Sequence, residues 1–298
     1  MGGNITRKTV VTGTSQEQAF LVCVSGKGRA GRVSAEESLK ELALLARSAG
    51  AGVVGRLVQQ LAVPTKAYYL GEGKLNELSG LKSTTNYNVV IVDTELSPLQ
   101  QRNLEDHLQV KVIDRVALIL DIFARRARTR EGQLQVELAQ HQYLAPRLAG
   151  RWSHLERLGG GIGTRGPGES QLETDRRLIN QRMHRLKSQI EEVRKRRHLY
   201  REKRQKSGIP VVALVGYTNA GKSTLLNTLS QADILVEGRL FATLDPTTRR
   251  VTLPDKTEIL FTDTVGFIRR LPPTIITAFR ATLEELSEAS ILVHVVDL

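Results

Sequence analysis

A phosphate-binding loop is the feature of the sequence that points most directly to chemistry. The residues with the spacing G-x-x-x-x-G-K-S are Gly216, Tyr217, Thr218, Asn219, Ala220, Gly221, Lys222 and Ser223. Glycines in this spacing let successive backbone amides face a phosphate, and a following helix directs its unpaired amides to the same anion. We expect Lys222 to reach the β- and γ-phosphates and the Ser223 hydroxyl to bind Mg²⁺. The loop therefore predicts a nucleoside triphosphate site, with a chance glycine-rich turn as the alternative.

A second motif, Asp263-Thr-Val-Gly266, has the form expected of the other half of this site. We expect the Asp263 carboxylate to hold Mg²⁺ through water and the Gly266 amide to sense the γ-phosphate. Thr264 and Val265 lie between them, so we assign both to the same nucleotide-binding segment.

Strands and helices in the required order surround both motifs. The apolar run Val211 to Val215 predicts a buried strand that enters the loop, and an apolar-periodic helix is expected from Thr224. A hairpin pair is expected over Arg250 to Leu253 and Glu258 to Thr262. Residues 208–298 are therefore predicted to form a P-loop domain.

Short apolar runs alternate with helical segments over the first part of the chain. We expect strands at Phe20 to Val24, Val53 to Val58, Asn88 to Asp93 and Val110 to Asp114, and helices at Ser34 to Ser48, Gly73 to Lys82 and Pro98 to His107. This alternation is typical of a small α/β domain with a mainly parallel sheet, here residues 1–114. Asp93 and Asp114 both end strands. Each could be a functional group at the sheet edge, but we favour a cap of the next helix or turn.

Residues 115–207 are predicted to form a long antiparallel helical hairpin. Before a glycine-rich loop, apolar residues recur at near-helical intervals at Val116, Leu120, Phe123, Leu134, Leu138, Leu144 and Leu148. After it, steps of four and three join Ile179, Met183, Leu186, Ile190 and Val193. Such a seam packs two helices together. The loop 159–168 could approach a phosphate-lined surface closely, and a flexible linker explains its composition equally well.

Positive charge gathers in the second half of this hairpin, and the whole chain has a formal net charge of +12. A basic face gains free energy by releasing counterions from nucleic acid, so we favour RNA-backbone binding over a solvated helix face. The residues that we assign to RNA binding are Gly160, Gly161, Gly163, Arg165, Arg176, Arg177, Arg194, Lys195, Arg196 and Arg197.

Composition bounds the setting of the protein. A chain of 298 residues is long enough for about two domains. Cys23 is the single cysteine, so no disulfide framework is possible, which fits the cytoplasm. No apolar run approaches the roughly 18 residues that span a bilayer, so we expect no stable membrane association. We also expect the free protein to be a monomer.

The chain resembles the HflX family of ribosome-associated GTPases, within the translation-factor-related class. The resemblance runs through nearly all of the sequence. It is carried by Asp114-Arg115, Leu120 to Phe123, Leu134 to Gln140, Gly159 to Arg177, Gly216 to Ser223, Phe241 to Asp245 and Asp263 to Gly266. The long glycine-rich stretch is the most specific of these.

This resemblance implies a GTP hydrolase that binds GTP, GDP and Mg²⁺ and associates with the large (50S) ribosomal subunit and its rRNA. It implies splitting or recycling of stalled or idle ribosomes, with the loop 159–168 reaching toward rRNA. Carried over residue by residue, the first switch segment is Phe241, Ala242, Thr243, Leu244 and Asp245. In this segment Thr243 is expected to join the Mg²⁺ shell, so that the nucleotide state gates binding.

Two residues shape the expected mechanism. Phe267 follows Gly266 where many small GTPases carry a water-orienting glutamine, so we expect slow hydrolysis that the ribosome accelerates. Asn219 resembles the asparagine of GTPases in which K⁺ supplies positive charge. Bracing of the loop through hydrogen bonds is an equal alternative for Asn219.

The sequence departs from a complete GTPase at its end. The Asn-Lys-x-Asp motif that reads guanine is expected beyond Leu298, so we expect a C-terminally incomplete domain that lacks its last strands. Guanine preference thus rests on the resemblance alone. Two other functions stay open, an RNA-remodelling ATPase and a non-enzymatic rRNA-binding module in this truncated form.

Overall fold

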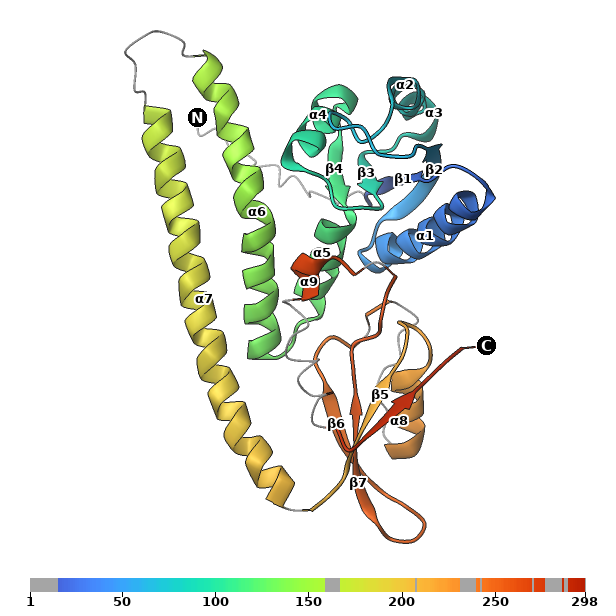
Figure 1. Cartoon of the computed structure of the whole chain (residues 1–298), viewed down its shortest axis with the longest axis vertical. Helices are drawn as coiled ribbons and strands as arrows, with labels where there is room; N and C mark the ends of the chain where they lie inside the picture. The colour runs from blue at the N-terminus through green and yellow to red at the C-terminus, as the bar shows by residue number, and fades with distance from the viewer. Residues whose placement is uncertain are drawn as a thin grey trace, which may run out of the picture.

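Two four-stranded sheets and a pair of long helices make up the molecule (Figure 1). The computed structural model describes residues 16–158, 167–206, 208–230, 240–241, 243–269, 271–276, 286 and 289–297. The first sheet lies at one end of Figure 1 and the second sheet at the other, and α7 runs along the side of the molecule from one end to the other. This arrangement confirms the predicted fold class, an N-terminal α/β part, a helical hairpin and a P-loop part.

The first sheet is parallel throughout, in the order β2-β1-β3-β4. Its strands are β1 (Gln18–Ser25), β2 (Gly52–Gln60), β3 (Val89–Val92) and β4 (Lys111–Asp114). Parallel neighbours need crossover connections, and helices supply them. These helices are α1 (Arg29–Ser48), α2 (Glu72–Gly80), α3 (Lys82–Thr85) and α4 (Pro98–Leu108). The expected strands and helices of this part are confirmed, with bounds shifted by a few residues.

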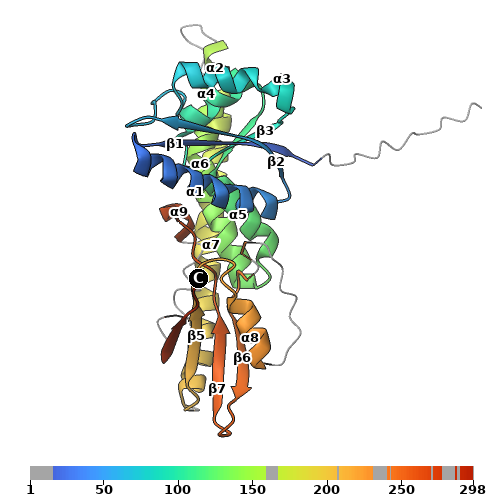
Figure 2. The same cartoon turned by 90° about the vertical axis from the view of Figure 1, so that its right-hand side faces the viewer.

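Both faces of the first sheet are buried. Leu21 and Cys23 of β1 pack in a core with α1, whereas Phe20 and Val22 point to the opposite face and pack with α2 and α4. Figure 2 shows α1 on one side of the sheet and α2, α3 and α4 on the other. Successive strand residues point to opposite faces, so a strand covered on both sides must be apolar throughout.

The two aspartates that end strands have different roles. Asp114 caps α5 (Arg115–Arg126), because its carboxylate accepts a hydrogen bond from the Ala117 amide at 2.9 Å. The cap interpretation is confirmed for Asp114. Asp93 is buried and instead binds side chains, accepting a hydrogen bond from Ser38 Oγ at 2.6 Å and pairing with Arg115 Nη1 at 2.9 Å.

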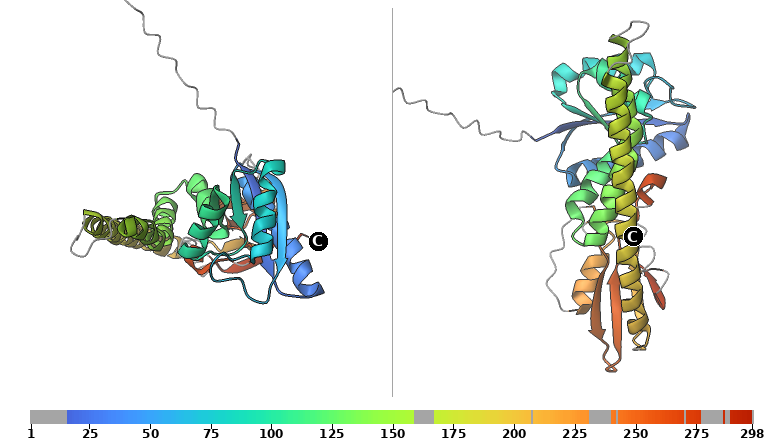
Figure 3. Two further views of the ribbon diagram at one scale, coloured as in Figure 1. Left: turned by 90° about the horizontal axis from the view of Figure 1, so that it is seen from above. Right: turned by 90° about the vertical axis from the view of Figure 1, so that its left-hand side faces the viewer.

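The helical hairpin consists of α6 (Arg130–Leu158) and α7 (Pro167–Lys206), which lie side by side in Figures 1 and 3. Leu134 and Leu186 are buried, as the expected seam requires. The expectation is wrong for Leu144, which is 45% exposed, whereas the neighbouring Tyr143 is buried in the core with α1 and α5. No helix within the described ranges could cross a membrane.

The second sheet is mixed, in the order β6-β7-β5-β8. Its strands are β5 (Val211–Val215), β6 (Thr247–Thr252), β7 (Glu258–Asp263) and β8 (Ile291–His294), and its helices are α8 (Lys222–Ser230) and the short α9 (Pro273–Ile276). The predicted hairpin is confirmed, because β6 pairs antiparallel with β7, whereas β5, β7 and β8 are parallel. Asp263 is the last residue of β7, so this strand delivers it to the edge where β5 enters the loop.

A shared core joins the two ends of the molecule. Phe241, Leu244 and Val265 belong to the same buried cluster as α1 and α5. The rings of Phe123 and Phe241 meet edge to face, with centroids 4.8 Å apart. The segments that flank the second sheet are therefore packed against the first part of the chain.

Candidate nucleotide site

The loop after β5 closes tightly around its own backbone. Gly216 has a φ of 151°, and a Cβ at this position would lie 2.3 Å from the carbonyl oxygen of Val295. A side chain cannot occupy that space, so glycine is required here. The helix α8 begins at Lys222, and its first amides are directed back toward the loop, as a phosphate site requires.

Lys222 spans the loop. Its side chain is buried, and Nζ donates hydrogen bonds to the carbonyl oxygens of Gly216 at 3.1 Å and Tyr217 at 2.6 Å. Burial lowers the pKa of the Lys222 ammonium, and the Asp263 carboxylate partly opposes that shift. An anion bound in the loop would favour the charged form, so this position suits a phosphate.

Three oxygen ligands meet beside Lys222. Ser223 Oγ donates to Asp263 Oδ2 at 2.6 Å, Thr243 Oγ1 donates to the same oxygen at 2.8 Å, and the two hydroxyls lie 3.0 Å apart. The other carboxylate oxygen, Asp263 Oδ1, is buried and has no hydrogen-bond partner among the described residues. Two hydroxyls and a carboxylate with an unsatisfied oxygen fit a hard cation such as Mg²⁺. The structure thus brings together the three residues expected to bind it.

The Asp-x-x-Gly motif lies directly against the loop. A Cβ on Gly266 would lie 2.5 Å from the Thr218 Cα, so the two backbones are in the closest possible contact. The Phe267 amide donates to the Gly216 carbonyl at 2.9 Å, and the Thr218 amide donates to the Phe267 carbonyl at 2.8 Å. The Phe267 side chain is 43% exposed. A movement of the phosphate-binding loop must therefore displace the segment at Gly266 and Phe267, and the reverse also holds.

The other residues expected at the site lie around these groups. Thr264 Oγ1 donates to the Leu214 carbonyl at 2.6 Å, and Val265 is in the shared core. In the first switch segment, the Thr243 hydroxyl is the side-chain group that reaches the site, because Phe241 and Leu244 are in the core and Asp245 faces α6. Ala242 lies outside the described residues. Direct nucleotide contacts of these residues stay a prediction.

Asn219 is exposed at the tip of the loop. Its φ of 66° is left-handed, a conformation that asparagine tolerates better than most residues. Its side chain makes no hydrogen bond to any residue in the described part of the chain. It lines a cavity of about 370 Å³ together with Ala220 and with Glu41 of α1. Within the described ranges nothing supports the bracing interpretation of Asn219.

Comparison with known proteins places this site in a family. The chain matches three family models in succession, GTP-binding GTPase N-terminal over residues 36–124, GTP-binding GTPase Middle Region over residues 126–204, and 50S ribosome-binding GTPase over residues 211–298. GTPase HflX of Caldanaerobacter subterraneus is 56% identical over 262 residues, and GTPase HflX of Escherichia coli is 51% identical over 261 residues. The chain belongs to the HflX GTPase family.

The HflX alignments cover 88% of this chain and 61% of each of these two relatives. The chain thus spans about three fifths of the length of the curated relatives that it matches. A crystal structure of SsGBP in complex with GDP is 26% identical to it, with a TM-score of 0.53, and the match covers 95% of this chain and 72% of that chain. The expected resemblance to the HflX family is confirmed.

A buried arginine holds the segment that follows the Asp-x-x-Gly motif in this HflX chain. Arg115, which is 1% exposed, pairs with Asp93 and Glu41 and donates through Nη2 to the Arg269 carbonyl at 2.8 Å. The Arg269 amide donates to Glu41 Oε1 at 3.1 Å, and its guanidinium pairs with Glu37. Sequence reasoning missed these roles, because Arg115 and Arg269 are far apart in the chain.

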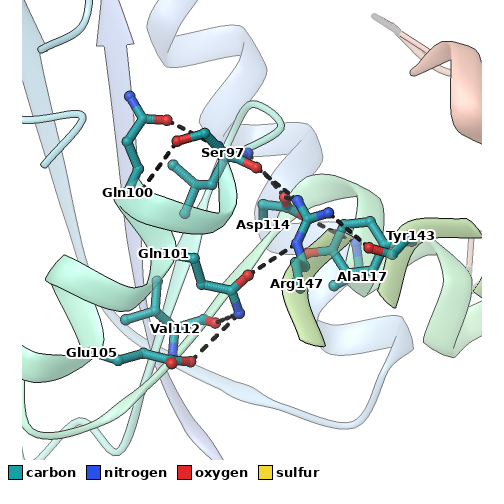
Figure 4. A network of polar contacts seen from close by, with 10 residues as sticks. Ser97, Gln100, Gln101, Glu105, Val112, Asp114, Ala117, Tyr143 and Arg147 are labelled. Atoms are coloured by element: carbon teal, nitrogen blue, oxygen red, sulfur yellow. Dashed lines mark hydrogen bonds and ion pairs between the residues drawn. The ribbon is translucent and has the colours of Figure 1, made fainter. Parts of the chain in front are cut away.

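A second arginine, the largely buried Arg147, fixes α6 to the first sheet, as Figure 4 shows. Arg147 Nη2 pairs with Asp114 Oδ2 at 3.1 Å and donates to the Leu96 carbonyl at 2.6 Å. Its guanidinium carbon lies 3.5 Å from the centre of the Tyr143 ring. Burial, followed by the nearby Asp114 carboxylate, raises the pKa of the Tyr143 hydroxyl. The Arg147–Asp114 ion pair thus adds to the packing that holds the hairpin against the first sheet.

The basic residues assigned to RNA binding are placed in part. Arg176, Arg177, Arg194, Lys195 and Arg196 are exposed along α7. Arg197 is different, because it pairs with Glu131 of α6 at 2.8 Å and is half-buried. The glycine-rich residues Gly160, Gly161 and Gly163, with Arg165, lie outside the described residues.

Proposed function

We propose that this protein is a cytoplasmic GTPase that binds the large ribosomal subunit and its rRNA, and that its nucleotide state gates this binding. The observation that carries the proposal is the meeting of Ser223, Thr243 and Asp263 beside the lysine of the phosphate-binding loop. These groups come from three separate segments, and one phosphate-bound cation would engage all three. Membership of the HflX family supports guanine as the base and the ribosome as the partner.

Each site residue has a definite task in this proposal. The loop amides and Lys222 bind the β- and γ-phosphates, while Ser223 and Thr243 supply hydroxyl oxygens to Mg²⁺ and Asp263 holds it through water. When bound, Mg²⁺ neutralises charge that develops on the transferred phosphoryl group. The Gly266 amide lies beside the loop, where it senses whether a γ-phosphate is present.

Hydrolysis by the free protein is slow in this proposal. Phe267 follows Gly266, and a phenyl ring cannot orient an attacking water. The exposed Asn219 at the tip of the loop is the residue that contacts K⁺ in this proposal, and K⁺ supplies an added positive charge. In this proposal, binding to the ribosome completes or reorders the nucleotide site and so accelerates hydrolysis.

The basic face of α7 serves as the RNA-binding surface in this proposal. Its exposed arginines and lysine carry positive charge along a rigid helix that starts beside the segment 159–166. Such a surface recognises backbone and shape rather than base sequence. Splitting or recycling of stalled ribosomes is the outcome that we propose for this binding.

A hydrolysis assay with and without large subunits tests the proposal. We expect GTP turnover to rise by more than about tenfold with large subunits, to need Mg²⁺, and to be faster in K⁺ than in Na⁺. Lys222→Ala should abolish it, and Arg250→Ala, in the exposed β6–β7 hairpin, is the control that should not. Equal rates with and without subunits, or a preference for ATP with free RNA, would contradict the proposal. Equal rates in K⁺ and Na⁺ would remove the K⁺ role alone.

A further inference from the structure

The first switch segment sends three consecutive side chains in three directions. Thr243 reaches the Ser223 and Asp263 cluster, Leu244 is buried in the shared core, and Asp245 faces the start of α6. The segment 243–245 therefore connects the nucleotide site to the hairpin within about 7 Å of chain.

The Asp245 carboxylate binds the backbone at the start of α6. Oδ2 accepts hydrogen bonds from the amides of Arg128 at 2.7 Å and Thr129 at 2.8 Å. Oδ1 accepts a hydrogen bond from the Thr129 hydroxyl. These groups lie at the positive end of the α6 dipole, where a carboxylate is stabilised.

Thr129 is itself the cap of α6. Its Oγ1 accepts a hydrogen bond from the Gly132 amide at 3.0 Å. Because the single hydroxyl proton is donated to Asp245, the lone pairs of Oγ1 are left to accept from Gly132. Asp245 thus sets the geometry of the cap from a distant part of the chain.

Gly132 leaves room for this carboxylate. A Cβ at position 132 would lie 2.4 Å from Asp245 Oδ1, so any larger residue must displace the carboxylate or the helix. The Asp245 carboxylate therefore packs directly against the backbone of the first turn of α6 at Gly132.

We propose that Asp245 is a positioning residue that couples the Mg²⁺-binding position of Thr243 to the order of the first turn of α6. This inference rests on the proposed function, because it takes the 243–245 segment to move with the nucleotide. When Thr243 leaves the site, Asp245 leaves the helix start, and the Thr129 cap of α6 loses the carboxylate that orients it. By linkage, a partner that orders α6 favours Thr243 in the site.

A cycle of substitutions in the nucleotide-free protein tests the contact itself. Gly132→Ala should lower the urea midpoint of the parent, because the methyl group meets the Asp245 carboxylate. In an Asp245→Ala background the same substitution should raise the midpoint, since alanine forms helix better than glycine. Gly73→Ala in α2 is the matched control, because a Cβ there meets nothing within 4 Å. The control should raise the midpoint in both backgrounds. A rise on Gly132→Ala in the parent would overturn the contact.

Hydrogen exchange of the amides of residues 130–135 tests the coupling. With Mg²⁺ and a saturating non-hydrolysable GTP analogue, these amides should exchange more slowly than with Mg²⁺ and GDP. Asp245→Asn should lose that difference. Asp255→Asn should keep it, because the Asp255 carboxylate binds Thr257 within the turn between β6 and β7. Binding of both nucleotides, measured by fluorescence, with no difference in exchange would overturn this inference and leave the proposed function standing. A protein that binds neither nucleotide would overturn both.

Discussion

The Lys222 ammonium lies in a buried position that favours its charged form only weakly unless an anion such as phosphate is bound beside it. Two carbonyl oxygens accept its hydrogen bonds, yet burial still lowers the pKa of its ammonium. Protonated Lys222 therefore weakens the nucleotide-free fold, and a bound phosphate reverses the penalty.

The stability of the nucleotide-free protein should reflect this penalty. Because the folded-state pKa of Lys222 lies below 10.5, the folded state loses the proton before the unfolded state does. The contribution of Lys222 to the free energy of unfolding is therefore constant below its lowered folded-state pKa. Between that pKa and 10.5, this contribution rises with pH. Urea unfolding of the parent and of Lys222→Met, from neutral pH upward, should show the parent gaining stability relative to the variant. Parallel pH profiles would contradict the assignment.

Local motifs made the nucleotide site predictable at the residue scale. Ser223 and Asp263 belong to short patterns whose spacing alone predicts that they share one site, and the structure brings them together. Arg115 and Asp245 have no such pattern, because their partners are set by packing between distant segments. In the sequence, Asp245 is an aspartate two residues after Thr243, and its carboxylate can accept hydrogen bonds from many groups. That property is too general to have predicted the start of α6 as its partner.

At the scale of elements, α6 links the other parts of the molecule. Arg147 fixes it to the first sheet through Asp114, and Asp245 binds the backbone at its start from beside the second sheet. Strand and helix positions were largely predictable, because continuous apolar runs and helical periodicity are local properties. The burial of Tyr143 in place of Leu144 was not, since Tyr143 packs against Arg147, a tertiary contact.

The Arg147 pair should contribute strongly to stability. Arg147→Met leaves the buried Asp114 carboxylate without its charged partner, so we expect a loss of about 3 kcal/mol in the free energy of unfolding. Arg182→Met is the control, because the pair of Arg182 with Glu137 is 47% and 34% exposed, and its loss should cost less than about 1 kcal/mol. Equal losses in chemical denaturation would contradict the role of Arg147.

At the scale of the whole molecule, the positively charged helix α7 and the candidate nucleotide site lie on connected parts. Much of the net positive charge of the chain lies on α7, where Arg176, Arg177, Arg194, Lys195 and Arg196 are exposed, and α7 packs along α6. The charge pattern was readable from the sequence. The connection was not, because it depends on the shared core and on the two arginine networks.

Binding to large subunits should therefore depend on salt through α7. Replacing Arg176 and Arg177 by glutamine should reduce the slope of log affinity against log salt by about 1.5. The control Arg182→Gln should change the slope less, because Glu137 already pairs with that guanidinium. An unchanged slope in the double variant would place the RNA-binding surface elsewhere.

Gating of ribosome binding by nucleotide is the central claim, and sedimentation with large subunits tests it most directly. The parent and Lys222→Ala are each pelleted with a non-hydrolysable GTP analogue, with GDP and without nucleotide. We predict that the parent pellets mainly with the GTP analogue and that Lys222→Ala loses this dependence. If Lys222→Ala pelleted as the parent does in all three conditions, nucleotide would not gate binding.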